Sequence, residues 1–79
     1  MDKEEFERSW NSVKKTQERI FIYIKGSFTD TDPSPFLFNV ADEYEFYLQS
    51  DSTYFVNFFE NGRYRGGVLL KSIIVVKGD

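Results

Sequence analysis

The residues with the clearest potential for chemistry are carboxylates in the middle of the chain. Glu43 and Glu45 are two residues apart, so on a strand they would share one face and could act as an acid and base pair. A solvated strand edge would explain the same pair. The sequence contains no His and no Cys, which removes the usual general base, the usual zinc ligands and any disulfide. We therefore predict that the protein is not an enzyme and needs no cofactor.

A second acidic group, Asp30-x-Asp32, carries the oxygen ligands that calcium prefers. Its spacing departs from a calcium-binding loop. Counted from Asp30, the position that requires Gly is occupied by Pro35, and no Glu stands at the position of the final ligand. We expect a loop without a metal ion.

Acidic and aromatic residues are concentrated in the same part of the chain. Residues 26–62 contain seven Asp or Glu, no Lys or Arg, and ten of the fifteen aromatic residues, whereas residues 63–79 have a net charge of +3. Two interpretations are open. The acids can be solvated strand faces and turns that pair across the sheet with the basic C-terminal segment. Alternatively, carboxylates steer a basic partner toward the protein and exposed aromatic side chains anchor it.

The second interpretation assigns residues to a binding surface. Tyrosine suits an anchoring role, because its ring is apolar while its hydroxyl tolerates water. We predict a small non-enzymatic interaction module that blocks a basic, nucleic-acid-binding protein. By analogy of protein type, this suits an inhibitor from a phage or mobile element. The predicted partner-binding residues are Asp42, Glu43, Tyr44, Glu45, Tyr47, Asp51 and Tyr54.

An alternative surface is the basic and aromatic cluster of Arg63, Tyr64 and Arg65. It could contact phosphate or stack a base in a homo-oligomeric small barrel that pairs strand edges between subunits and binds single-stranded nucleic acid or a small ligand. The net charge of the chain is −3, which argues against a dedicated nucleic-acid-binding protein.

Hydrophobic periodicity predicts one helix followed by strands. Apolar residues including Phe6, Trp10 and Val13 recur at the helical period over residues 2–18, with Asp2 as the N-cap. From Ile20 the pattern alternates, which is typical of strands. Asn61-Gly62 predicts a two-residue type I′ hairpin that sets Glu60 opposite Arg63 and Phe59 opposite Tyr64, and Gly66-Gly67 predicts a bulge. Further strands are expected over residues 36–40, 44–48, 53–60, 68–70 and 73–76.

These elements predict an α+β fold in a single domain of 79 residues. An amphipathic N-terminal helix (about 2–18) should pack on a strongly bent, five- to six-stranded antiparallel meander (about 20–77), as a small roll or partly open barrel. Aromatic residues make up 19% of the chain, more than so small a core can easily enclose. Some of them should therefore lie at the surface, where an aromatic patch usually indicates a partner.

The order of a helix and a bent five-stranded sheet is similar to that of Sm-like proteins, and residues 56–69 resemble their first strand-turn-strand motif. In that family the motif directly follows the helix, whereas here it lies near the C-terminus. The sequence is therefore not assigned to that family. No apolar run is long enough to span a membrane, and the first residues lack the apolar segment of a signal peptide, so we expect a cytoplasmic protein.

Overall fold

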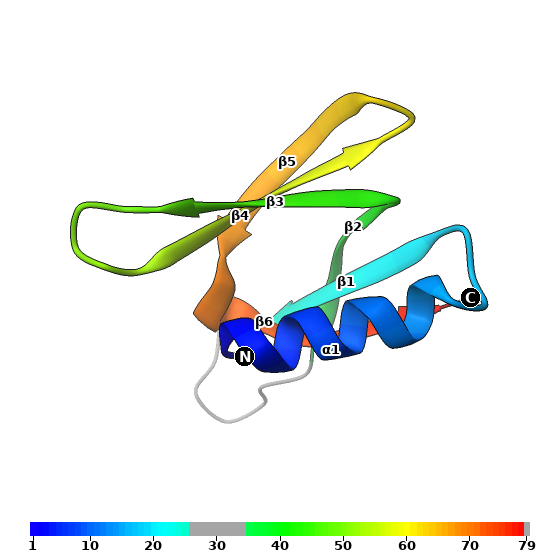
Figure 1. Cartoon of the computed structure of the whole chain (residues 1–79), viewed down its shortest axis with the longest axis horizontal. Helices are drawn as coiled ribbons and strands as arrows, with labels where there is room; N and C mark the ends of the chain where they lie inside the picture. Colours follow the sequence, from blue (N-terminus) through cyan, green and yellow to red (C-terminus); the bar gives the residue numbers. More distant parts are fainter. Residues whose placement is uncertain (26–34, 79) are drawn as a thin grey trace.

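The computed structural model describes residues 1–25 and 35–78, and these form one helix and two small antiparallel sheets (Figure 1). Sheet A has the strand order β2-β1-β6 and sheet B the order β3-β4-β5. The predicted α+β fold is confirmed, and the two sheets do not close into a barrel.

The elements are α1 (Lys3–Lys14), β1 (Ile20–Lys25), β2 (Pro35–Ala41), β3 (Glu43–Leu48), β4 (Tyr54–Glu60), β5 (Arg63–Leu69), the short 3-10 helix η1 (Leu70–Ser72) and β6 (Ile73–Gly78). The expected loop around Asp30 and Asp32 lies outside the described residues.

The helix α1 begins where the sequence predicts and ends four residues early. The Asp2 side chain accepts a hydrogen bond of 2.8 Å from the backbone N–H of Glu5 and so caps the first turn. At the other end, the N–H groups of Thr16 and Gln17 both donate to the carbonyl of Val13, which closes the helix in a tight turn. This turn gives the chain room to reverse before β1.

One aromatic and aliphatic core joins the helix to both sheets. Phe6 is fully buried, and its ring meets the rings of Tyr44 and Phe46 edge-on at centroid distances of 4.9 and 5.6 Å. Trp10, another residue of the apolar stripe identified in the sequence, is 4% exposed and belongs to the core. Ile20 and Ile22 close the same core from sheet A. Complete burial of each such side chain stabilises the fold by about 1.5–3 kcal/mol.

The two sheets are linked by short bends in the chain. Between β2 and β3 only Asp42 intervenes, and between β5 and β6 the chain passes through η1. That interruption covers the gap between the strands predicted over residues 68–70 and 73–76. After it, β6 returns to pair with β1 and not with β5. Sheet A thus combines the first two strands of the chain with the last one, and sheet B contains the three strands between them.

The hairpin between β4 and β5 follows the predicted turn. Asn61 and Gly62 have φ angles of 52° and 78°, as a type I′ turn requires. Phe59 lies opposite Tyr64, as predicted, with the rings 5.7 Å apart. Gly66, at φ 118°, accompanies the predicted bulge, and the register shifts there. No helix within residues 1–25 and 35–78 is both long and apolar enough to cross a membrane.

Candidate protein-binding surface

Strand β3 divides the predicted binding residues between the two faces of sheet B. It pairs with β4 in an unbroken antiparallel register over its whole length, and successive side chains therefore alternate between the faces. Glu43, Glu45 and Tyr47 point away from the core, and all three are exposed. Tyr44 lies between them in sequence but points into the core. Only the first three share a surface.

The row on β3 continues across the other two strands. Glu43 lies opposite Phe59, Glu45 opposite Asn57 and Tyr47 opposite Phe55. Among the described residues, none of the side chains on this face belongs to the core cluster through which α1 and sheet A pack on sheet B. We call this surface the outer face of sheet B, and its residues are Glu43, Glu45, Tyr47, Phe55, Asn57, Phe59, Tyr64 and Leu69.

Neighbouring residues position two aromatic side chains of the outer face, Phe55 and Tyr64. A side chain at Gly67 would overlap the ring of Phe55, so this ring rests on the bare backbone of the glycine. The hydroxyl of Tyr64 donates a 3.1 Å hydrogen bond to Asn57. Tyr47 and Tyr64 nevertheless remain 61% and 60% exposed. The face therefore offers ordered aromatic area to a second molecule.

The charge of the outer face is negative. Glu43 and Glu45 carry its two carboxylates, and their cross-strand neighbours are uncharged. Across the part of the chain that the structure describes, one ion pair is formed, between Arg19 and Glu60 at 3.4 Å. Both glutamates are thus available to a basic group from another molecule.

Tyr44 and Tyr54, two of the predicted anchors, contribute to the core instead. The Tyr44 ring lies 4.8 Å from that of Trp10, and burial, with a smaller contribution from the charge of Glu7, raises the pKa of its hydroxyl. The Tyr54 ring packs at 5.7 Å against Phe46. The ammonium of Lys3 lies 5.1 Å from the centroid of the Tyr54 ring, in a cation–π contact.

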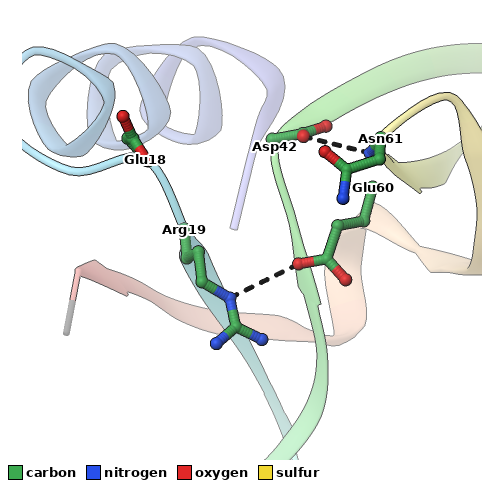
Figure 2. Close-up of a pocket in the computed structure, with 5 residues that line it drawn as sticks. All are labelled: Glu18, Arg19, Asp42, Glu60 and Asn61. Atoms are coloured by element: carbon green, nitrogen blue, oxygen red, sulfur yellow. Dashed lines mark hydrogen bonds and ion pairs between the residues drawn. The ribbon is translucent and has the colours of Figure 1, made fainter.

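Asp42 lies at the bend between β2 and β3, beside a polar cavity of about 440 Å³ (Figure 2). One of its carboxylate oxygens accepts a 3.1 Å hydrogen bond from the N–H of Asn61, and its backbone carbonyl accepts one of 2.7 Å from Lys14. The other carboxylate oxygen, Oδ1, is buried without a donor among the described residues. Glu18, Arg19 and Glu60 complete the lining of the cavity. The hydrogen bond to Asn61 therefore connects the β4–β5 hairpin to the bend between β2 and β3.

Asp51 belongs to the turn between β3 and β4. Its carboxylate accepts hydrogen bonds from the hydroxyl and the backbone N–H of Thr53, and these bonds lower the pKa of Asp51. Because Asx turns of this kind are formed on local grounds, the contacts of Asp51 are those of a turn residue.

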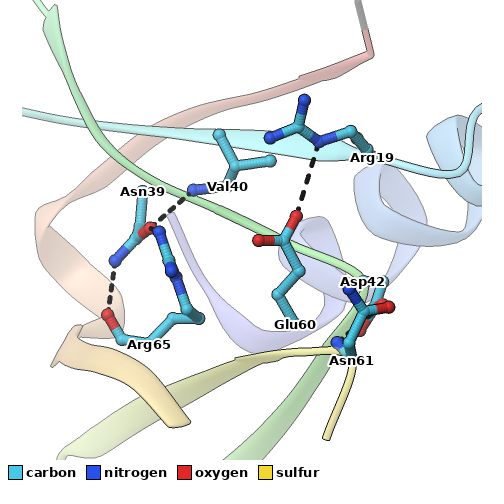
Figure 3. Close-up of polar contacts among 7 residues, drawn as sticks. All are labelled: Arg19, Asn39, Val40, Asp42, Glu60, Asn61 and Arg65. Atoms are coloured by element: carbon cyan, nitrogen blue, oxygen red, sulfur yellow. Dashed lines mark hydrogen bonds and ion pairs between the residues drawn. The ribbon is translucent and has the colours of Figure 1, made fainter. Parts of the chain in front are cut away.

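The alternative basic cluster is also divided by the fold. Arg63 is exposed at the end of the hairpin, and Tyr64 lies on the outer face of sheet B. Arg65 occupies the bulge, with its guanidinium 3.4 Å from the side-chain oxygen of Asn39 on β2 (Figure 3). The structure therefore does not bring these three side chains together on one surface.

Apart from Tyr64, which it assigned to the alternative basic cluster, the sequence analysis named none of the outer-face residues on β4 and β5 as part of a binding surface. Phe55 and Phe59 alternate with Val56 and Phe58, which are both fully buried. The hairpin predicted at Asn61-Gly62 sets Phe59 opposite Tyr64, and the predicted bulge shifts the register beyond that pair. These two signals, combined with the alternation along β4, would have identified the face. Comparison with protein-family models, curated proteins and solved structures finds no match for this chain.

Proposed function

We propose that this protein is a non-enzymatic interaction module whose outer face of sheet B binds a basic protein. The observation that carries the proposal is a sheet face with two exposed tyrosine rings, two half-buried phenylalanine rings and two carboxylates that form no ion pair among the described residues, none of which belongs to the core cluster. Stable protein interfaces bury about 800 Å² on each partner. That area is roughly a seventh of the molecular surface of 5457 Å², which one face of so small a molecule can supply.

The chemistry of the face favours a basic partner. Exposed aromatic rings anchor interfaces because they bury large areas with little loss of side-chain freedom. Carboxylates at the margin accelerate the encounter with a positive surface and oppose a negative one. Proteins that bind nucleic acid present such positive surfaces. A small protein that covers one would block it, which suits a cytoplasmic inhibitor from a phage or mobile element.

The test compares two variants of equal charge change. Glu43→Lys with Glu45→Lys reverses both carboxylates of the outer face. Glu4→Lys with Glu18→Lys reverses two exposed carboxylates on the helix and on the segment before β1. Each tagged variant captures protein from nuclease-treated lysate of the native host, with elution in a salt gradient. We expect the natural protein and the control variant to retain one basic protein that moderate salt releases, and the outer-face variant to lose it.

Two results would overturn the proposal. The first is equal capture by both double variants, which would show that the outer face does not determine binding. The second is a loss of capture accompanied by a large fall in the thermal midpoint of the outer-face variant, which would make the two glutamates structural. Light scattering behind a sizing column tests the alternative function, because a ring of subunits would favour the homo-oligomeric barrel.

A further inference from the structure

We infer that the basic partner contributes an extended strand that pairs with the free edge of β3. This inference rests on the proposed function and adds the way in which the partner is held. Among the described residues β3 pairs with β4 on one side only, and it lies at the margin of its sheet (Figure 1). An unpaired edge offers backbone donors and acceptors to another chain.

The hydrogen bonds at the end of the hairpin show which backbone groups the edge offers. The N–H of Gln49 donates to the carbonyl of Thr53 across the turn between β3 and β4. In an antiparallel pair, the residues that bond to the partner strand recur at every second position. Glu43, Glu45 and Tyr47 therefore bond to β4. The backbone groups that point to the free edge belong to Tyr44, Phe46 and Leu48.

The edge of β3 is more regular than the other sheet edges. The register between β3 and β4 is unbroken, whereas the pairs β1–β2, β1–β6 and β4–β5 each contain a shift. The edge of β5 is also occupied, since the side chain of Asn39 donates a hydrogen bond to the carbonyl of Arg65 (Figure 3). Bulges and side-chain contacts of this kind protect an edge from pairing. Among the described residues, neither a register shift nor a side-chain hydrogen bond protects the free edge of β3 from Glu43 to Leu48.

The side chains beside this edge specify the strand that fits. In an added antiparallel strand, the residues opposite Glu43, Glu45 and Tyr47 form the pairs without hydrogen bonds, in which side chains lie closest. Lys or Arg at two alternate positions would meet the two carboxylates. The residues between them would lie beside Tyr44 and Phe46 and should be apolar. At the start of β3, Lys14 occupies the carbonyl of Asp42 at 2.7 Å, so the available stretch is short.

The same charges disfavour two of the registers that a second copy of this chain could adopt. A two-fold antiparallel pair of β3 strands centred on Glu45 sets this residue against its own copy, and a pair centred on Tyr44 sets Glu43 against Glu45. Like charges directly opposite one another destabilise a pair of strands. A pair centred on Phe46 sets Glu45 against Tyr47, which avoids the repulsion but leaves the carboxylates without a cation. A basic strand places a cation opposite the carboxylates, which makes it the occupant that the charges favour.

The test uses a synthetic seven-residue peptide in which lysine alternates with valine. In one form the valines carry N-methyl groups, which remove the N–H donors that would face β3. In the matched form the lysines carry them, where the N–H points away from β3. Binding is followed by amide hydrogen exchange and by titration of the amide NMR signals. We expect new protection at Tyr44, Phe46 and Leu48. We also expect methylation at valine to weaken binding by about fivefold per lost hydrogen bond, roughly 100-fold for three, and methylation at lysine to have little effect.

The other outcomes separate the two proposals. If both methylated peptides bind equally and Glu43→Lys with Glu45→Lys still weakens binding, strand addition is wrong and the proposed function stands. If valine methylation matters but the charge reversal does not, the edge accepts strands of any charge, and both the basic occupant and the proposed function fail. Absence of binding at about 1 mM peptide overturns strand addition. Protection at the same amides that increases with protein concentration, together with a dimer in light scattering, makes a second copy the occupant.

Discussion

The two faces of sheet B are both aromatic, yet only one of them is needed to form the core. On the inner face, Phe46 and Phe58 pack against Phe6 of the helix. On the outer face, Phe55 and Phe59 lie on β4 at the alternate positions, where Phe55 lies over Gly67 and Phe59 packs against Tyr64. The inner and outer rows of aromatic side chains therefore contain similar rings, but only the inner row packs against the helix.

The difference lies in the residues placed between the rings. Val56 accompanies the inner rings, whereas Glu43, Glu45 and Asn57 accompany the outer ones. Burial of a carboxylate, or of an amide without a hydrogen-bond partner, carries a desolvation cost, so these three polar side chains favour burial of the opposite row of rings. An aromatic content of 19% therefore serves two purposes, one in folding and one that we propose to be binding.

The largest expected effect comes from truncating rings at neighbouring positions on opposite faces. Phe58→Ala should lower the free energy of unfolding by about 3–5 kcal/mol, because it leaves a cavity beside Phe6 and Trp10. Phe59→Ala should cost only about 1 kcal/mol, because this half-buried ring is already partly in contact with water. Urea unfolding monitored by Trp10 fluorescence measures both values. Similar losses for the two variants would show that the outer face is part of the folding core.

An intermediate effect is expected from Gly67→Ala. A Cβ at this position would overlap the Phe55 ring and the Asn57 side-chain oxygen. Both are outer ends of side chains on the outer face, so they can move at a modest cost of about 1 kcal/mol. The NMR signals of Phe55 should shift, while those of Phe58 on the inner face should not. A loss as large as that of Phe58→Ala would indicate that the two faces are mechanically coupled.

Local signals made much of this fold predictable. The Asp2 cap, the Asn61-Gly62 turn and the strand beginning at Ile20 depend on neighbouring residues and were each identified from the sequence. The end of α1 was predicted four residues late, because Gln17 continues the apolar spacing although the chain has already turned at Val13. The return of β6 to β1 depends on contacts distant in sequence, which periodicity does not encode.

The candidate surface was predictable only in part, for a related reason. Charge and residue type identified Glu43, Glu45 and Tyr47, and the structure places these three on one exposed face. The same criteria grouped Tyr44 with them, although alternation assigns it to the opposite face. Composition along the chain cannot distinguish two faces of one strand. The register with the neighbouring strands is needed for that distinction.

A small effect should follow removal of a polar contact from the outer face. Tyr64→Phe deletes the hydroxyl that donates to Asn57 over 3.1 Å. Because the bond is exposed, water can replace it, and the unfolding free energy should change by no more than about 0.5 kcal/mol. The measurement is the urea midpoint, with the Asn57 side-chain amide signals as a local probe. A loss above about 1 kcal/mol would contradict the assignment of this face as dispensable for folding.

The smallest expected effect concerns Tyr44, an inner-face residue near the start of β3, and is confined to alkaline pH. Burial and, to a lesser extent, the charge of Glu7 raise the pKa of Tyr44 above the ordinary value of 10.0. The unfolded chain therefore releases the tyrosine proton more readily than the folded protein does. The part of the folding free energy that depends on the Tyr44 proton is fully present below pH 10, and it decreases as the pH rises through the raised pKa. Tyr44→Phe should make stability fall less steeply above pH 10, and Glu7→Gln should do so to a smaller extent, in urea unfolding at a series of pH values. Parallel declines in all three proteins would mean that the Tyr44 hydroxyl is solvated, and the inner face would then be less distinct from the outer one than its ring contacts imply.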